Sequence, residues 1–528
     1  MGGARRHGAE TFSIVGEGTL GESAGGRQGR SLPASTEAAA VPFRFSRTGP
    51  KGVAVGEMIL RKVANAMVEG GGSFGTIPAG FTYLGQFIDH DLTFDATDVM
   101  LGEDVSPAEL LQARSPSLDL DSLYGSGPDS DKSAAFYRDD RHLKVGTTVS
   151  FGGDPARAGF DLPRVGTGST AAARRKALIP DLRNDENLAV AQTHLAFIRF
   201  HNRVVDALGP AVPPGKRLFR ARRSVTKHYQ WMIRHDFLPR ICDRAIVRDV
   251  FVNGRKIVEP DAAPMDVPTM PVEFSVAAFR LGHSMIRRDY DWNARFPVAF
   301  GTLQFLFEFS ATSGTLNGNP RLPSNWIADW RRMYDFRPVR PGLAVPGHPF
   351  NRARRIDTLL AMPLDDLPPG SFGGTAADIG TIQANLAFRN MVRGDMVKLA
   401  SGQQMAAFCR SKGVQVATLT DAQVRGGSNR GAVLDGLTTL QRQRFLANTP
   451  LWFYILREAE LNNGKLTGVG ARIVAETFHR AIEGSRDSIL RDTAWRPRFG
   501  PDDRTFRMID LLFFAFEGNA ALLAPLGD

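Results

Sequence analysis

Apolar residues recur at helical spacing along most of this chain, and patterns that alternate with a period of two are scarce. Such spacing predicts amphipathic or buried helices rather than strands. The main stretches are residues 54–69, 187–206, 217–250, 272–286, 378–399 and 506–516. No obvious boundary separates them, so the sequence predicts an all-α fold, a large and mainly helical single domain over residues 43–528 with little β structure. Residues 1–42 are rich in Gly, Ala and Arg, and we expect a flexible arm there.

One predicted helix, within residues 81–95, carries three consecutive acid–base side chains. Asp89, His90 and Asp91 lie among apolar residues at positions 81, 84, 87, 88, 92 and 94. Neighbours on a helix point about 100° apart, so these three side chains cannot share one task. Gln86 precedes His90 by four residues and shares its face. Buried charges are costly unless they are paired, ligated or chemically active, although satisfied polar groups near a helix terminus remain an alternative.

A polar segment at residues 114–125 places oxygen-bearing side chains at every second position. These are Ser115, Ser117, Asp119 and Asp121. If the segment is extended, alternate residues face the same way and the four oxygens line one side. That arrangement suits a hard cation such as Ca²⁺, which prefers oxygen ligands. The spacing is not that of an EF-hand, and a solvated edge with alternating polarity is the other interpretation.

Polar residues also mark the start and the interior of the helix predicted at 187–206. Arg183 and Glu186 come just before it, where an ion pair at the helix start is the simplest interpretation. His194 and His201 are seven residues apart on one face. No acid or cysteine completes a metal site beside them, so we expect structural histidines with satisfied ring nitrogens.

Two further helices carry polar groups on apolar backgrounds. His283 follows Gly282 in the stretch 272–286, where the missing side chain of the glycine leaves room for a bulky group. A lone histidine on an apolar helix is otherwise a core residue. Asn390 and Arg393 lie in the stretch 378–399, after an Ile/Leu run.

Composition narrows the possible functions. The 528 residues carry a formal net charge of +10, but the basic residues are spread along the chain, which disfavours nucleic-acid binding. The two cysteines, Cys242 and Cys409, exclude a disulfide framework and a thiolate zinc site, and we expect two buried free thiols. Neither a signal peptide nor a membrane span is evident. Export by a non-classical route and a cytoplasmic location both stay open, as does the oligomeric state.

Two imidazoles on separate apolar helices, together with an Arg–Glu pair and an Asn–Arg pair on others, are what a buried haem requires. One neutral histidine ligates the iron, and a second, unligated histidine moves the proton when the O–O bond of peroxide breaks. A cation beside the second histidine stabilises the charge that develops.

These motifs, in this order over residues 45–525, resemble the animal-type haem peroxidases of the peroxidase–cyclooxygenase superfamily, in particular the compact bacterial members. The stretch GQFIDHD at residues 85–91 is similar to the distal motif of that family. The resemblance implies that His90 is the distal acid–base group and Gln86 its partner. It also implies that Asp89 forms an ester with the haem and that Asp91 ligates calcium.

The other motifs extend the resemblance. The stretch SPSLDLDSLYG is similar to the calcium loop, with Ser115, Ser117, Asp119 and Asp121 as ligands. The resemblance implies that Arg183 is the distal arginine and that Glu186 forms a second ester with the haem. It also implies that His283 ligates the iron and that Arg280 contacts a haem propionate. Asn390 and Arg393 would belong to the segment whose asparagine accepts a hydrogen bond from the proximal imidazole. The implied cofactors are haem b, linked through Asp89 and Glu186, and Ca²⁺.

Departures from the pattern qualify the resemblance. Myeloperoxidase-like members carry a methionine after the ester glutamate, where this chain has Asn187, so we do not expect a sulfonium link to the haem.

The expected function is reduction of hydrogen peroxide with oxidation of a small organic donor or a halide. A fatty-acid dioxygenase is one alternative. Such enzymes need a tyrosine near the haem, commonly three residues before the proximal histidine, where this chain has Arg280. Tyr334 is expected to be a packing residue. A non-catalytic scaffold, which would lack His90, Arg183 or His283, is the other.

Overall fold

The computed structural model describes residues 43–68, 73–97, 99–297, 300–345, 347, 349–426 and 431–528, so the arm expected at 1–42 lies outside the described residues. The helices are α1 (Glu57–Met67), α2 (Gly80–Leu92), α3 (Asp121–Tyr124), α4 (Ala171–Arg175), α5 (Leu188–Asp206), α6 (Arg217–Met232), α7 (Leu238–Ile241), α8 (Arg244–Asn253), α9 (Gly282–Met285), α10 (Leu303–Glu308), α11 (Trp330–Met333), α12 (Leu386–Met396), α13 (Gly402–Ser411), α14 (Asp421–Arg425), α15 (Thr439–Ala447), α16 (Leu451–Leu461), α17 (Gly468–Glu483), α18 (Met508–Ala515) and α19 (Ala520–Leu523). The prediction of a mainly helical fold is confirmed.

The strands of the described residues form four small sheets of two strands each. The pairs are β1 (Phe45–Ser46) with β5 (Met270–Pro271), β2 (Phe74–Pro78) with β8 (Arg352–Arg354), β3 (Gly146–Thr147) with β4 (Ala158–Asp161), and β6 (Asp289–Tyr290) with β7 (Gly301–Thr302). Only the first pair is parallel. The β1–β5 and β2–β8 sheets join segments that are distant in the sequence, the other two sheets are local, and none of the four forms a layer of the core.

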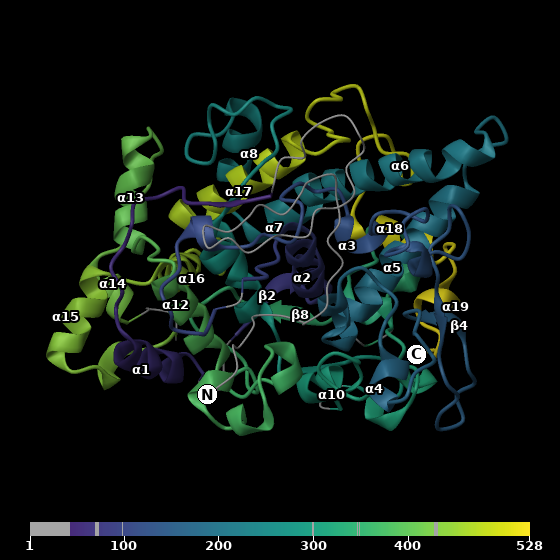
Figure 1. The fold of residues 1–528 in the computed structure, drawn as a ribbon, viewed down its shortest axis with the longest axis horizontal. Helices are drawn as coiled ribbons and strands as arrows, with labels where there is room; N and C mark the ends of the chain where they lie inside the picture. The colour runs from purple at the N-terminus through teal and green to yellow at the C-terminus, as the bar shows by residue number, and fades with distance from the viewer. Residues whose placement is uncertain are drawn as a thin grey trace.

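Helix α2 lies at the centre of the molecule, with α5 beside it (Figure 1). Its apolar residues belong to one hydrophobic cluster that extends from Phe45 to Leu523. Gly80 opens the helix because the ring of Tyr334 packs against it: a Cβ at this position would lie 2.2 Å from that ring. Tyr334 is completely buried and also contacts Phe81 edge-on, so it is the packing residue that the sequence predicts.

The prediction of one continuous helix over residues 217–250 is wrong. After α6 the chain forms a π-helical turn at Ile233–Phe237, continues as α7, stops at Cys242 and starts again as α8. Pro239 explains the π turn, because proline lacks an N–H and its ring displaces the carbonyl one turn earlier. Asp243 then starts α8 by accepting a hydrogen bond from the Ala245 N–H.

The stretch 272–286 is helical, but it changes type twice. A π turn at Glu273–Ala277 is followed by a 3₁₀ turn at Ala278–Leu281 and then by α9, which carries His283. The long helix predicted after Glu186 is confirmed as α5, with Asn187 as its N-cap residue. Cys242 and Cys409 are both free and buried, as predicted. Among the described residues, no helix has the length and apolarity needed to cross a membrane.

Candidate functional site

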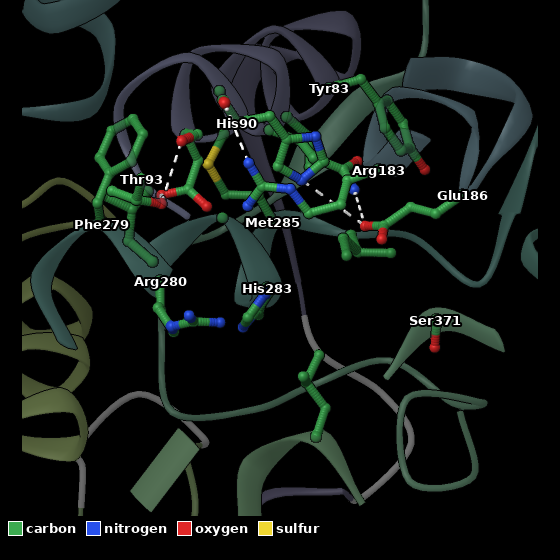
Figure 2. Close-up of a pocket in the computed structure, with 18 of the residues that line it drawn as sticks. Tyr83, His90, Thr93, Arg183, Glu186, Phe279, Arg280, His283, Met285 and Ser371 are labelled. Atoms are coloured by element: carbon green, nitrogen blue, oxygen red, sulfur yellow. Dashed lines mark hydrogen bonds and ion pairs between the residues drawn. The ribbon is translucent and has the colours of Figure 1, made fainter. Parts of the chain in front are cut away.

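One cavity brings together residues from α2, from the turn before α5, from the 278–286 segment and from α12. Figure 2 shows His90 and Arg183 on one side of it and His283 with Arg280 on the other. The rest of the wall is largely apolar and comes from distant parts of the chain. Its apolar side chains include Leu303, Phe307, Leu364, Leu367, Phe372 and Leu386. Residues separated by about 200 positions in the sequence therefore meet around one enclosed space.

His90 is held from one side only. Its Nδ1 lies 2.9 Å from Oδ1 of Asn184, and both side chains are buried. Its Nε2 lies 3.8 Å from Oε1 of Glu186, which is too far for a hydrogen bond. Burial, reinforced by the charge of Arg183, lowers the pKa of His90 to about 3. The imidazole is therefore neutral at physiological pH.

Arg183 is fixed by a buried carboxylate. Its Nε and Nη2 donate to Oδ1 and Oδ2 of Asp181 at 3.0 and 2.7 Å, and Nη2 also donates to the His90 carbonyl at 3.1 Å. Arg114 binds the same carboxylate at 2.8 Å, and the ring of Phe94 lies under the Arg183 guanidinium, 4.3 Å from its centroid. Burial opposes ionisation of Asp181, but the two arginines hold its pKa far below its usual range. Arg183 thus pairs with Asp181, and no ion pair with Glu186 forms at the helix start.

Gln86 lies in the cavity wall, but its amide does not bind His90. Its Nε2 donates to Oε1 of Glu186 at 2.6 Å, and its Oε1 accepts from Nδ2 of Asn187 at 2.9 Å. The partner of His90 is instead Asn184, which the sequence analysis did not single out. Asn184 and Asp181 lie in the same short segment as Arg183, and this closeness in the sequence was the signal from which their part in the site could have been predicted.

Two carboxyl groups face the cavity from the side of His90. Asp89 accepts from the Thr93 hydroxyl at 3.2 Å, and burial raises its pKa despite the opposing charges of Arg280 and Arg183. Burial also raises the pKa of Glu186, to about 7. Buried carboxyl groups with raised pKa values are costly to keep ionised, which is typical of groups that bond to a partner or take part in chemistry.

On the opposite side, His283 contacts α12 through its Nδ1, which lies 2.8 Å from Nδ2 of Asn390. Rotating this amide by 180° places Oδ1 at the same point, so the side chain can accept from an Nδ1–H. Nε2 is then free for a ligand. Arg280 donates to the Ser275 carbonyl at 3.0 Å, and burial lowers its pKa. Arg393 also lines the cavity and forms an ion pair with Asp95.

Asp91 points away from the cavity, as the helical geometry predicts. Its carboxylate accepts from the Leu120 N–H at 3.3 Å and from the Ser122 hydroxyl at 3.2 Å. Burial raises the pKa of Asp91 well above its usual value, and the charges of Asp121 and Asp119 add to the effect. Asp89, His90 and Asp91 therefore face three different surroundings.

Residues 115–121 do not form the extended segment on which the argument from alternating oxygens depends. The chain bends at residues 116–119, and Leu120 has a left-handed backbone with φ 60°. The backbone curls because N–H groups of this segment turn toward the carboxylate of Asp91. Ser115 donates to Asp119 at 3.4 Å, Ser117 is buried, and burial with the charge of Asp121 raises the pKa of Asp119 to about 7. Among the described residues, no group of three His, Cys, Asp or Glu side chains is arranged to hold a metal by itself.

The two histidines of α5 have different surroundings. His201 is satisfied: Nδ1 lies 3.0 Å from the Tyr124 hydroxyl and Nε2 lies 2.8 Å from the Arg141 carbonyl. His194 is fully buried with its ring edge-on to Phe87, and neither ring nitrogen has a hydrogen-bond partner among the described residues. The prediction of satisfied nitrogens is confirmed for His201 and wrong for His194.

The cavity also contains a tyrosine that the sequence analysis missed. Tyr83 lines it from the same face of α2 as His90, about two helical turns earlier, and its hydroxyl donates to that of Tyr290 at 2.7 Å. Both phenols are buried, and burial raises the pKa of each. Tyr334 is not among the residues that line the cavity.

The residues of the cavity fit a haem. Two imidazoles face it from opposite sides, and the guanidinium groups of Arg280 and Arg393, which also line it, have the charge that would pair with the haem carboxylates. Gly282 lines the cavity beside His283, and a Cβ at this position would meet no atom within 4 Å, so the glycine borders open space.

Comparisons with known proteins agree with this fit. Residues 98–304 match the family model for the animal haem peroxidase. The chain is 26% identical over 329 residues to the human eosinophil peroxidase, an alignment that covers 59% of this chain and 40% of that protein. It is 30% identical over 114 residues to the Aedes aegypti chorion peroxidase, covering 20% of this chain and 14% of that protein. The chain thus spans less than half the length of these relatives.

Solved structures share the fold at low sequence identity. Peroxidase A from Dictyostelium discoideum superposes with a TM-score of 0.55 at 15% identity, covering 91% of this chain and 93% of that one. A fatty acid alpha-dioxygenase from Arabidopsis thaliana superposes with a TM-score of 0.54 at 13% identity, covering 91% of this chain and 78% of that one. The shared fold accommodates both activities, so the residues in the cavity have to distinguish them.

Proposed function

Because the chain belongs to the peroxidase–cyclooxygenase superfamily, we propose that it is a haem peroxidase, which reduces hydrogen peroxide and oxidises small organic donors or halides. The observation that carries the proposal is the pairing of a neutral His90 with a fixed Arg183 across one cavity from His283. A base, a cation and an iron ligand in this arrangement are what heterolysis of peroxide needs.

His283 would hold the iron through Nε2, and the Asn390 amide would orient the ring and make it a more basic ligand. Arg280 and Arg393 would bind the haem carboxylates. When bound, the haem supplies an iron that coordinates peroxide and takes up its oxidising equivalents. The residues around the cavity therefore supply ligation, orientation and charge compensation.

His90 is the group that moves the proton. Its Nε2 takes a proton from one peroxide oxygen and returns it to the other, which leaves as water. Arg183 stabilises the charge that develops during the cleavage. Among the described residues, Nη1 of Arg183 is the guanidinium nitrogen that makes no hydrogen bond, so it is available to the peroxide. Gln86 acts indirectly, by holding Glu186 at the edge of the cavity.

Asp89 and Glu186 are proposed to bind the haem covalently through ester bonds. Their carboxyl groups line the cavity, and burial favours their neutral forms, which an ester preserves. Acid–acetone extraction followed by mass spectrometry of the peptides tests the proposal. Haem that extracts freely from enzyme that has already turned over peroxide would exclude both links.

Calcium is proposed to bind where Asp91 meets the 115–121 segment. Burial raises the pKa values of Asp91 and Asp119, and the negative charge of Asp121 adds to both shifts, an effect that a divalent ion would reverse. Serine and carbonyl oxygens of the same segment, at Ser115 and Ser117, would complete an all-oxygen site.

A fatty-acid dioxygenase is the second candidate, and Tyr83 is the observation in its favour. A dioxygenase requires a tyrosine at the haem, and Tyr83 borders the cavity, although it comes from α2 and not from the segment of His283. Its hydroxyl proton is already engaged in a hydrogen bond to the Tyr290 hydroxyl. For this reason the peroxidase is preferred.

The test uses the full chain loaded with haem. The peroxidase proposal expects a Soret band, oxidation of a phenolic donor that depends on peroxide, and no uptake of O₂ with a fatty acid. His283→Ala should lose the Soret band. His90→Gln should keep it and lose activity by roughly 10²- to 10⁴-fold.

His235→Ala is the matched control, because this exposed histidine lies outside the cavity and its replacement should change neither property. O₂ uptake with a fatty acid that is lost in Tyr83→Phe would establish the dioxygenase instead. A chain that binds haem but consumes neither peroxide nor O₂ would be a non-catalytic scaffold.

A further inference from the structure

Asn184 is the one hydrogen-bond partner of the His90 ring among the described residues. Its Oδ1 lies 2.9 Å from Nδ1, and its side chain has no exposed surface. The amide comes from the 3₁₀ turn at Leu182–Asp185, immediately after Arg183. The contact therefore joins α2 to the turn that also carries the distal cation.

The chemistry of the two groups decides where the imidazole proton sits. A neutral imidazole carries one N–H, on either Nδ1 or Nε2, and an amide oxygen can only accept a hydrogen bond. An Nδ1–H that donates to Oδ1 of Asn184 leaves Nε2 with its lone pair. Nε2 has no hydrogen-bond partner, since the nearest acidic oxygen, on Glu186, is 3.8 Å away.

The orientation of the ring is fixed as well. Arg183 donates to the carbonyl of His90 at 3.1 Å, so the backbone and the ring of this residue are each held by the same turn. Gln86, which shares the helix face of His90, has both ends of its amide engaged by Glu186 and Asn187. Gln86 therefore cannot set the tautomer, and Asn184 is the remaining candidate among the described residues.

We propose that Asn184 is the positioning residue of the distal histidine: its amide oxygen fixes the Nδ1–H tautomer of His90, so that the Nε2 lone pair points into the cavity. This inference rests on the proposed peroxidase function, because the fixed tautomer matters only if His90 accepts a proton from peroxide. Without the fixed tautomer, an imidazole with its proton on Nε2 would present a donor to peroxide and could not accept the first proton.

The opposite orientation of the amide makes the opposite prediction. If Nδ2 of Asn184 faced Nδ1, it would donate, and the ring proton would move to Nε2.

Nδ2 has no partner among the described residues, so replacing Asn184 by Asp removes no hydrogen bond and keeps an acceptor facing Nδ1. Asn184→Asp and Asn184→Leu are therefore a matched pair, since they are similar in size and differ in whether they accept.

The experiment reads the tautomer directly in the full chain labelled with ¹⁵N-histidine, without peroxide, by two-bond ¹⁵N–¹H correlation. The His90 signals are assigned from their loss in His90→Gln. Wild type and Asn184→Asp should show the proton on Nδ1, and Asn184→Leu should move a measurable fraction of it to Nε2. His201 is an internal reference, because its Nε2 faces the Arg141 carbonyl and should stay protonated in every variant.

Activity of the haem-loaded chain is the second measurement. Asn184→Leu should lower the peroxide-dependent rate by roughly 10- to 1,000-fold, and Asn184→Asp should retain far more of it. A wild-type His90 protonated on Nε2, or an Asn184→Leu variant that keeps the wild-type tautomer, overturns the proposal. If Asn184→Leu does not fold, the wild-type and Asn184→Asp spectra still decide. The tautomer is measured without turnover, so its outcome is independent of whether the chain proves to be a peroxidase.

Discussion

Asp181 holds the guanidinium of Arg183 at two points, with 3.0 Å from Nε to Oδ1 and 2.7 Å from Nη2 to Oδ2. The carboxylate is completely buried and also binds Arg114. A two-point pair of this kind fixes both the position and the plane of the cation. The guanidinium of Arg183 in the cavity wall is therefore held in place by a residue that does not itself line the cavity.

Asp181→Asn should therefore lower activity while leaving haem bound. The change keeps the shape of the side chain but removes the charge that holds Arg183. We expect peroxidase activity to fall about 10- to 100-fold, with the free energy of unfolding lower by about 3–5 kcal/mol. Steady-state assays and urea unfolding measure the two effects.

Asp185→Asn is the matched control for that variant. Asp185 is a buried carboxylate on the same turn, but it pairs with Arg164 and not with Arg183. It should destabilise the fold without lowering the activity of each folded molecule. Equal losses of activity in the two variants would contradict the role assigned to Asp181.

Asn390→Leu should weaken haem binding, because His283 loses the group that orients its ring. Partners of this kind typically change ligand affinity or activity by about 10- to 100-fold. Titration of the haem-free chain with haem, followed at the Soret band, measures the effect. Asn390→Asp keeps an acceptor and should bind haem nearly as tightly as wild type; equally tight binding by the leucine variant would argue against the contact.

Removal of calcium should destabilise the chain and change the haem environment. Without the cation, the like charges of Asp91, Asp119 and Asp121 repel inside the fold. We expect a chelator to lower the melting temperature and to shift the Soret band, and added Ca²⁺ to restore both. Asp121→Asn should abolish the response, whereas Asp140→Asn, at an exposed position, should retain it. A chain indifferent to chelation has no calcium site there.

Glu186→Gln should make the haem-free chain more stable at neutral pH. Burial raises the pKa of Glu186 from 4.5 to about 7, so the folded state keeps its proton longer than the unfolded state does. The stability associated with this group is fully present below about pH 4.5 and is lost as the pH rises toward 7. Glutamine keeps an acceptor for Gln86 and does not ionise.

Urea unfolding at pH 4.5 and pH 8 tests this expectation. The variant should gain about 1–3 kcal/mol over wild type at pH 8 and almost nothing at pH 4.5. Asp140→Asn again provides a control, because it changes a carboxylate at the surface. A gain that is the same at both pH values would show that ionisation of Glu186 is not the cause.

The sequence by itself determined the helical fold and which polar residues occur on its apolar helices. Helical spacing predicts buried helices, and the acid–base groups around His90 on such a helix are costly unless they are paired, ligated or chemically active. The divergence of Asp89, His90 and Asp91 follows from helix geometry alone, and the structure shows each of them in different surroundings.

Only the tertiary structure decided which groups touch. The π turn before Pro239 has a local cause that the sequence already contains. The segment 115–121, in contrast, curls around Asp91, because backbone donors follow partners that are distant in the sequence. The same limit explains why Gln86 was predicted to be the partner of His90, whereas Asn184 is the one that binds it. Spacing along a helix fixes the direction of a side chain, but its partner comes from whichever segment packs opposite.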